Sequence, residues 1–471
     1  MNKAKKLIKN TAMLFTGSFV TKILSFLLVP FYTSILSTSD YGTADLISTT
    51  VLLVLPFTSL LMDEAVMRFA LDKGNDQKQV FTIAMTVSTA GFIVAMCLSP
   101  IILLFESIRP YYLFVILYYV SLWIYNICTS YVKGLDKFSV IAVAGVTHTI
   151  FYIGINILCL AILKIGVYGY LLAIDLSNFI AALFLIISCK LYKNFVSIKK
   201  IDRDMAKKMI NYSVPMIPDY ISWWVVNCSD RYMVAFFCGT GVTGIYSVAY
   251  KIPSVLSSLT SIFSSAWRIS SVDEFGSEAS IRFYKQVYRT YSCILFVGGA
   301  ILIACVKILA KILFANEFYA AWHITPILIF AYILSAQAIF VGSIFTASKK
   351  TKNMAVAPLI GAVVNIVMNA ILIPIYGGTG AAIGTVIGYI TILVINLFMT
   401  SKILNMQLLI KQDILVYMFI VIEIIAFLSE TLIGWGVVVI CCAGELLLNL
   451  KWIRRVLEIF VTRFNKKQEN D

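Results

Sequence analysis

Long apolar stretches fill most of this sequence, and no other feature restricts its fold as much. A helix needs about 20 apolar residues to cross the roughly 30 Å hydrocarbon core of a bilayer. The 471-residue chain is 60% hydrophobic and 13% charged, whereas a soluble domain is about one quarter charged. The stretches are continuous rather than alternating, which excludes a β-barrel. We therefore predict an all-α polytopic membrane protein with fourteen transmembrane helices, at about 10–36, 44–69, 80–105, 111–132, 138–163, 167–192, 209–237, 243–271, 286–311, 322–348, 353–375, 379–404, 412–430 and 432–450.

The positive charges predict which side of the membrane each loop faces. Cytoplasmic loops of membrane proteins carry an excess of Lys and Arg. Most of the 38 Lys and Arg residues lie in the two termini or in every second loop. This pattern predicts a multi-pass protein of the bacterial cytoplasmic (inner) membrane with both termini in the cytoplasm. It also explains the net charge of +14 without a nucleic-acid partner.

The beginning of the chain resembles a signal peptide, with MNKAKKLIKN followed by an apolar run. The run is too long for a signal peptide and lacks a small-residue cleavage site. We expect an uncleaved first helix.

Weak internal repetition predicts two related halves. DYGTADL at 40–46 corresponds to VTGIYSV at 242–248, and GVYG at 166–169 corresponds to GGTG at 377–380. Six spans separate the equivalents, so the repeats are parallel and related by an axis along the membrane normal. The basic segment between the halves is expected to lie along the inner leaflet. The predicted domains are an N-terminal lobe at 1–192, a cytoplasmic interfacial linker at 193–208, a C-terminal lobe at 209–404, two extra helices at 405–450 and a cytoplasmic tail at 451–471.

Three segments resemble a known family. They are DYG at 40–42, the series running from YSVPMIPDYIS to SDRYMVAFFCGTGVTGIYSVAYKI at 212–252, and GTGAAIGT at 378–385. They resemble the polysaccharide-transport branch of the multidrug/oligosaccharidyl-lipid/polysaccharide exporter superfamily, which includes O-antigen-type flippases. The resemblance covers the first twelve spans. It implies a MATE-like, two-lobed fold that alternates between inward- and outward-open states, and a cationic cavity. It also implies a polyprenyl-pyrophosphate-linked glycan as cargo, a membrane-lipid environment and contact with polysaccharide polymerase machinery.

Three cations lie within apolar spans, where charge costs about 2.5–3.5 kcal/mol per residue and normally lines an enclosed cavity. They are Lys22, Arg231 and Lys251. With a rise of 1.5 Å per residue, Lys22 and Lys251 both lie about 20 Å above the inner face. We predict that the three cations bind lipid pyrophosphate or an acidic sugar through charge-assisted contacts. The alternative is that each extends to a lipid headgroup or pairs with a carboxylate.

Acidic residues are candidates for ion coupling and for gating. Asp175 and Asp219 lie near the midplane, where a buried carboxylate can carry H⁺ or Na⁺ or serve as a counter-ion to a cation. Glu423 and Glu445, in the two extra spans, rank below them for this role. At the cytoplasmic end of the second span, an inner gate or an ordinary interfacial salt bridge is predicted from Asp63, Glu64 and Arg68.

Neither a cofactor nor a metal is expected. The ten cysteines contain no C-x-x-C and lie in or at the ends of apolar spans, and the chain has two histidines. Cysteines placed in this way are typical of buried small hydrophobes rather than disulfides or zinc ligands.

The leading hypothesis is a flippase, not an enzyme, that moves a polyprenyl-pyrophosphate-linked repeat unit to the outer leaflet for surface polysaccharide biosynthesis of the O-antigen or capsule type. Lipid II is an alternative cargo. A multidrug or cation antiporter of the same superfamily is one rival, and it would prefer an acidic, aromatic cavity. A membrane polysaccharide polymerase or glycosyltransferase is the other. Such an enzyme needs carboxylates on a sizeable outer loop, and the predicted outer loops are short.

Overall fold

The apolar stretches of the sequence form helices, because a helix satisfies every backbone polar group within its own segment. The computed structural model describes residues 24, 26–257, 260, 263–264, 267, 278–348, 355–404 and 407–468, so Lys22 lies outside the described residues. Within these ranges all regular elements are helices. Nine of them are long and apolar enough to cross a membrane. The prediction of an all-α polytopic membrane protein is confirmed.

The chain divides into two compact units. Unit 1 contains 1–224, 238–244 and 313–316, and unit 2 contains 225–237, 245–312 and 317–471. The predicted linker, 193–208, lies within unit 1.

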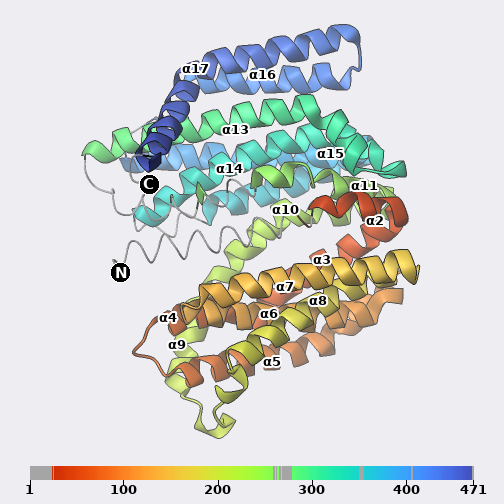
Figure 1. The fold of residues 1–471 in the computed structure, drawn as a ribbon, viewed down its shortest axis with the longest axis vertical. Coiled ribbons are helices and arrows are strands. Elements are labelled where there is room, and N and C mark those ends of the chain that lie inside the picture. Colours follow the sequence, from red (N-terminus) through yellow and green to blue (C-terminus); the bar gives the residue numbers. More distant parts are fainter. Residues whose placement is uncertain are drawn as a thin grey trace. The chain divides into compact units, whose positions relative to one another are not determined.

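Unit 1 is built mainly from the first half of the chain (Figure 1). Helix α7 packs against α8, and α6 packs against both α8 and α4. Helix α5 packs against α3 and α4, and the short amphipathic α9 also packs against α4. The helices are α2 (Val29–Ile35), α3 (Thr38–Ser59), α4 (Met62–Leu71), α5 (Gln77–Leu98) with its 3₁₀ extension η1 (Ser99–Leu104), η2 (Arg109–Tyr111), α6 (Tyr112–Gly134), α7 (Phe138–Asn156) with its π-helical extension η3 (Ile157–Ile162), α8 (Gly166–Ser188), η4 (Leu191–Lys193), η5 (Ile198–Lys200), α9 (Arg203–Ser213) and η6 (Val214–Met216).

Unit 2 holds the later helices, of which α14 packs against α15 and α16 packs against α17 (Figure 1). Two elements near the middle of the chain, α10 (Ile217–Cys238) and α11 (Thr240–Ala249), each contribute residues to both units. The others are α13 (Glu278–Leu313), η7 (Asn316–His323), α14 (Thr325–Ala347), α15 (Val356–Leu404), α16 (Lys411–Leu428) and α17 (Leu432–Gln468).

Three predicted spans differ in detail from the helices that form. The span at 44–69 is broken into α3 and α4 by Leu60 and Leu61, whose φ angles are 53° and 51°. Left-handed backbone is uncommon for residues other than glycine, so this break is a locally strained point. The span at 243–271 begins as α11, which ends at Ala249. The spans at 353–375 and 379–404 form one element, α15, with a kink at Gly377 where φ is 57° and ψ is −134°.

Two glycines allow α3 and the start of α11 to cross at very short range within unit 1. A Cβ on Gly42 would lie 2.1 Å from the Thr240 carbonyl oxygen, and a Cβ on Gly244 would lie 1.9 Å from the Thr38 carbonyl oxygen. Beside this crossing, the hydroxyls of Ser39 and Thr240 are 2.7 Å apart. The sequence comparison had aligned the segments that contain these two glycines, and the structure brings them into mutual contact.

Candidate functional site

Unit 2 contains a buried polar cluster centred on Asp230, which lies in α10 and is 0% exposed. Its Oδ2 accepts hydrogen bonds from the hydroxyls of Tyr246 at 2.5 Å and Tyr250 at 2.9 Å. A third donor is the Thr385 hydroxyl of α15, at 3.2 Å. We call these four residues the Asp230 cluster. It ties α10 to α11, to the residue that follows α11 and to α15.

Arg231 and Lys251 lie beside this cluster. The Arg231 guanidinium is 5.1 Å from the centroid of the Tyr250 ring, a distance typical of a cation–π contact. Lys251 immediately follows Tyr250, and both cations are half-buried. The Tyr332 hydroxyl of α14 lies within electrostatic range of Arg231, Lys251 and Asp230. One predicted cation, Arg231, therefore packs on an aromatic ring of unit 2, and a second, Lys251, lies within electrostatic range of Tyr332.

The partners of Asp230 in this cluster are uncharged, so the pattern of charged residues in the sequence does not indicate them. The usable signal was the spacing of Tyr246 and Tyr250, four residues apart, which places both rings on one helix face. Thr385 lies in the GTGAAIGT segment, where the glycines drew attention instead. A further hydrogen bond joins α10 to α15, from the Tyr389 hydroxyl to Asn227 Oδ1 at 2.7 Å. No sequence pattern predicts this bond.

In unit 1 the predicted coupling residue Asp175 lies in α8 and is 4% exposed. Within the described part of the chain, its Oδ2 has no hydrogen-bond partner. Tyr118 of α6 is close enough to interact with it electrostatically. An unsatisfied carboxylate oxygen in an apolar span is costly, so this atom is a ready acceptor for a proton.

His148 of α7 contacts α8 two residues beyond Asp175 in the sequence. Its Nε2 is 3.2 Å from the Ser177 hydroxyl. The ring is stacked between Tyr125 and Tyr152, with centroid distances of 5.8 Å and 6.2 Å. These contacts give His148 a packed position between α6, α7 and α8.

The remaining predicted residues lie around α4 and the start of α10. Glu64 accepts a hydrogen bond from the Tyr220 hydroxyl at 2.7 Å. Asp63 is half-buried in the first turn of α4, and Arg68 is exposed near its end. Asp219 lies in the first turn of α10 and is half-buried. The structure thus links Glu64 to α10, directly after the break at Leu60–Leu61.

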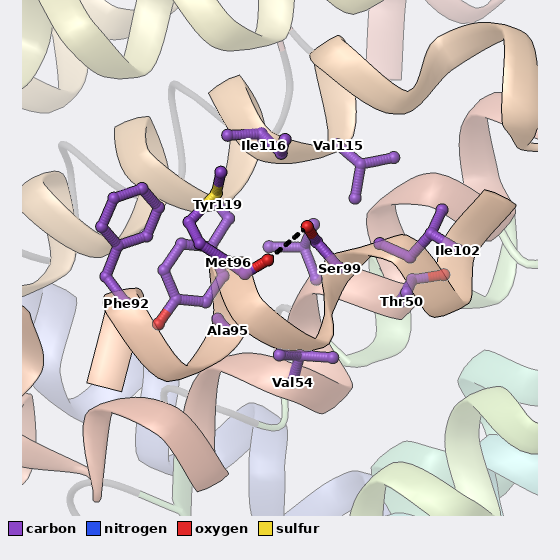
Figure 2. Close-up of a pocket in the computed structure, with 11 residues that line it drawn as sticks. Thr50, Val54, Phe92, Ala95, Met96, Ser99, Ile102, Val115, Ile116 and Tyr119 are labelled. Atoms are coloured by element: carbon purple, nitrogen blue, oxygen red, sulfur yellow. Dashed lines mark hydrogen bonds between the residues drawn. The ribbon is translucent and has the colours of Figure 1, made fainter. Parts of the chain in front are cut away.

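Unit 1 also contains a cavity of about 40 Å³ between α3, α5 with η1, and α6 (Figure 2). Figure 2 shows Phe92, Met96 and other apolar side chains around it, with the Ser99 hydroxyl bonded to the Met96 carbonyl oxygen at 2.7 Å. Two other hydroxyls line the wall. That of Tyr119 is 2.6 Å from Thr58 Oγ1, and that of Thr50 donates to the Leu46 carbonyl oxygen at 2.7 Å. The polar atoms are therefore already paired, and the cavity suits hydrocarbon rather than a charged headgroup.

Among the residues that the structure describes, no group of three or more His, Cys, Asp or Glu side chains could hold a metal ion. The chemistry available at Arg231 and Lys251 is charge-assisted binding of an anion. The chemistry available at Asp175 is proton or cation exchange.

Comparison with known proteins places these features in context. The profile of the family described as polysaccharide biosynthesis protein matches residues 7–268, more than half of the chain. An uncharacterized membrane protein, MJ1068, of Methanocaldococcus jannaschii is 26% identical over 57% of this chain and 51% of its own length. A probable low-salt glycan biosynthesis flippase, Agl15, of Haloferax volcanii is 24% identical over 45% of this chain and 46% of its own length. The chain spans about half the length of these curated relatives.

Solved structures show the same fold. The inward closed conformation of the lipid II flippase MurJ aligns with a TM-score of 0.71 at 15% identity, covering 95% of this chain and 99% of that one. An inward-facing MATE family multidrug resistance transporter aligns with a TM-score of 0.61 at 12% identity, covering 82% and 94%. At such low identity the likeness concerns the fold alone.

Proposed function

Because the chain belongs to the polysaccharide biosynthesis protein family, we propose that it is a flippase for a polyprenyl-pyrophosphate-linked oligosaccharide. It moves the glycan headgroup from the cytoplasmic to the outer leaflet while the lipid tail stays in the bilayer. The product serves the assembly of a surface polysaccharide of the O-antigen or capsule type. No bond is made or broken, so the protein is a transporter and not an enzyme.

The observation that supports this proposal is that Arg231 of α10 and Lys251, in the turn after α11, both lie within electrostatic range of Tyr332 in an apolar part of the chain. Cations in apolar spans are costly unless an anion lies near them, and we propose that the headgroup supplies this anion in addition to Asp230, which neighbours Arg231. A pyrophosphate presents several oxygens to Lys and Arg, and the contacts are strengthened where water is scarce. Lys22, which lies outside the described residues, completes the predicted set. Tyr332 and Tyr250 give the cations an aromatic wall against which a sugar face can stack.

Transport requires that the site open alternately to the two sides. The two lobes at 1–192 and 209–404 are proposed to rock about the headgroup, joined by the linker at 193–208. Asp63, Glu64 and Arg68 form the proposed inner gate, in which the bond between Glu64 and Tyr220 is made and broken. The strained break at Leu60–Leu61 supports this role, because strain concentrates at elements that move.

Ion coupling is assigned to Asp175 or Asp219, with H⁺ or Na⁺ as the driving ion. Asp175 is the better supported of the two, because its Oδ2 is buried and has no hydrogen-bond partner in the described residues. The protein is proposed to reside in the cytoplasmic membrane with both termini in the cytoplasm, alongside the polymerase machinery that uses its product.

The direct test is transport by the purified full-length protein in proteoliposomes loaded with a labelled undecaprenyl-pyrophosphate-linked oligosaccharide. Movement is read from the fraction of glycan that a membrane-impermeant glycosidase can reach. We expect this fraction to approach completion with the protein and to stay near one half in empty vesicles. Equal accessibility in both preparations would contradict the proposal.

A multidrug or cation antiporter is the second candidate, favoured by the fold shared with MATE family transporters. That function would give increased drug susceptibility on deletion of the gene and restoration on expression of the protein. Unchanged drug susceptibility together with glycan movement in the vesicles would reject the antiporter and support the flippase.

A further inference from the structure

Helices α16 and α17 pack against each other and carry two buried glutamates that the proposed transport mechanism does not use. Glu423 in α16 and Glu445 in α17 are both 0% exposed. Glu423 is twelve residues from the start of α16, and Glu445 is thirteen from the start of α17. At 1.5 Å per residue both lie about 18–20 Å along their helices, near the middle of a 30 Å core.

The two glutamates lie about one helical turn apart along the seam between these helices. The Cys442 thiol donates to Glu423 Oε1, with the sulfur 3.3 Å from the oxygen. Glu445 follows Cys442 by three residues and so projects from the same face of α17. Glu445 also interacts electrostatically with Glu423. The helices are close here, since a Cβ on Gly444 would lie 3.3 Å from the ring of Phe419.

Three of the four carboxyl oxygens are left without a hydrogen-bond partner. Within the described residues neither Glu423 Oε2 nor either oxygen of Glu445 has one. Cys442 satisfies only the remaining oxygen of Glu423. A fully buried carboxylate with no hydrogen-bond donor costs several kcal/mol, so these oxygens need a bound proton or another positive charge.

Charged and titratable groups on the surrounding elements do not fill this need. Arg289 of α13 forms an ion pair with Asp413 at the first turn of α16, about 15 Å along the helix from Glu423. Lys307 of α13 is 3.2 Å from Glu430 in the loop between the two helices. Exposed cations at the cytoplasmic ends are Lys411, Lys451 and Arg454.

The other polar groups that line the hairpin are engaged elsewhere. From α13, the Cys293 sulfur contacts the Asn449 carbonyl oxygen at 3.9 Å. The Asn449 side chain donates to the backbone carbonyl of Glu445 rather than to its carboxylate. Between α14 and α16, Tyr417 donates to Gln337 at 2.7 Å. Cys441, which lies next to Cys442, is buried.

We propose that Glu423 and Glu445 form a proton-binding site in which the two carboxyl groups share a proton at mid-membrane. A proton from water adds to one carboxylate oxygen and forms an O–H bond that points to the other carboxylate. Two ionised carboxylates that interact in an apolar medium are strongly disfavoured. One bound proton removes the repulsion and supplies a hydrogen-bond donor. The site is independent of glycan binding and lies in the helices beyond the predicted twelve-helix repeat.

The experiment is infrared spectroscopy of the purified full-length protein in lipid nanodiscs without glycan, recorded in H₂O and D₂O across a pH series. A protonated buried carboxyl gives a C=O stretch that shifts in D₂O and vanishes on ionisation. We expect this band in the natural protein. The E423Q/E445Q variant should lose the part of this C=O band that comes from the two glutamates. The control Glu106→Gln, which alters an exposed loop residue, should keep it.

The single variant E445Q guards against misfolding of the double variant. With one neighbouring charge removed, the remaining Glu423 should release its proton at a pH lower by about one unit or more. Thermal unfolding of each variant confirms that it is folded. An unchanged band in E423Q/E445Q, or an unchanged pH midpoint in a folded E445Q, would overturn the proposal. Because no glycan is present, either result leaves the flippase assignment standing.

Discussion

Asp175 in unit 1 and Asp230 in unit 2 are both buried aspartates on apolar helices, and their surroundings are opposite. Asp230 receives hydrogen bonds from Tyr246, Tyr250 and Thr385. Asp175 has an oxygen with no hydrogen-bond partner in the described residues. The same side chain therefore stands in two different environments. The satisfied carboxylate joins helices, whereas the unsatisfied oxygen of the other supports the proposed exchange of a proton or an ion at Asp175.

The largest effect is expected from Asp230→Ala. This change leaves the hydroxyls of Tyr246, Tyr250 and Thr385 without their acceptor and leaves Arg231 without its neighbouring charge. Removing one partner of a buried charged network costs about 3–5 kcal/mol. Thermal unfolding in detergent should show a large drop in the midpoint. A midpoint within a degree or two of the natural protein would mean that the Asp230 cluster does not join the helices.

In unit 1 the backbones of α3 and α11 cross at short range, whereas in unit 2 the Asp230 cluster joins helices through side chains. Gly244→Val tests the contribution of the crossing. The new side chain would collide with the Thr38 carbonyl oxygen, which lies 1.9 Å from the position of a Cβ. Overpacking of this kind costs about 1–3 kcal/mol. Gly154→Ala is the matched control, since a Cβ there meets nothing within 4 Å. Equal unfolding midpoints for the two variants would argue against a close crossing.

Substituting the tyrosine beside each aspartate gives a second comparison of the two environments. Tyr246→Phe removes one hydrogen bond to Asp230 and should lower the free energy of unfolding by about 1 kcal/mol. Tyr118→Phe removes a hydroxyl whose interaction with Asp175 is electrostatic, and should cost less. The measurement is denaturant or thermal unfolding of the two variants side by side. A larger loss in Tyr118→Phe would reverse the comparison.

Asp175→Asn should have the smallest effect on stability, below about 1 kcal/mol, because the side chain gives up no hydrogen bond from Oδ2. Its effect on transport should be large, since an amide cannot bind and release a proton. Glycan movement in vesicles should fall at least tenfold and should no longer respond to a pH gradient. Normal, gradient-dependent movement would remove Asp175 from the coupling role.

The sequence predicted the class of fold well, because continuous apolar stretches leave few alternatives in a bilayer. Charge within an apolar span also singled out Arg231 and Lys251 as candidate headgroup ligands, and this role stays a prediction. The sequence could not locate the contact between Thr385 and Asp230, since residues 155 positions apart meet only after folding. The break at Leu60–Leu61 was equally hidden, because leucine favours a continuous helix and only packing forces it into left-handed backbone.

The cations form the proposed headgroup site, and one measurement tests them directly. Glycan movement in proteoliposomes should be compared for the natural protein, the Lys22→Ala/Lys251→Ala variant and the exposed control Lys411→Ala. We predict loss of movement in the double variant, with unchanged insertion and unfolding midpoint, and normal movement in the control. Normal movement with both lysines replaced would contradict the assignment of a cationic headgroup site.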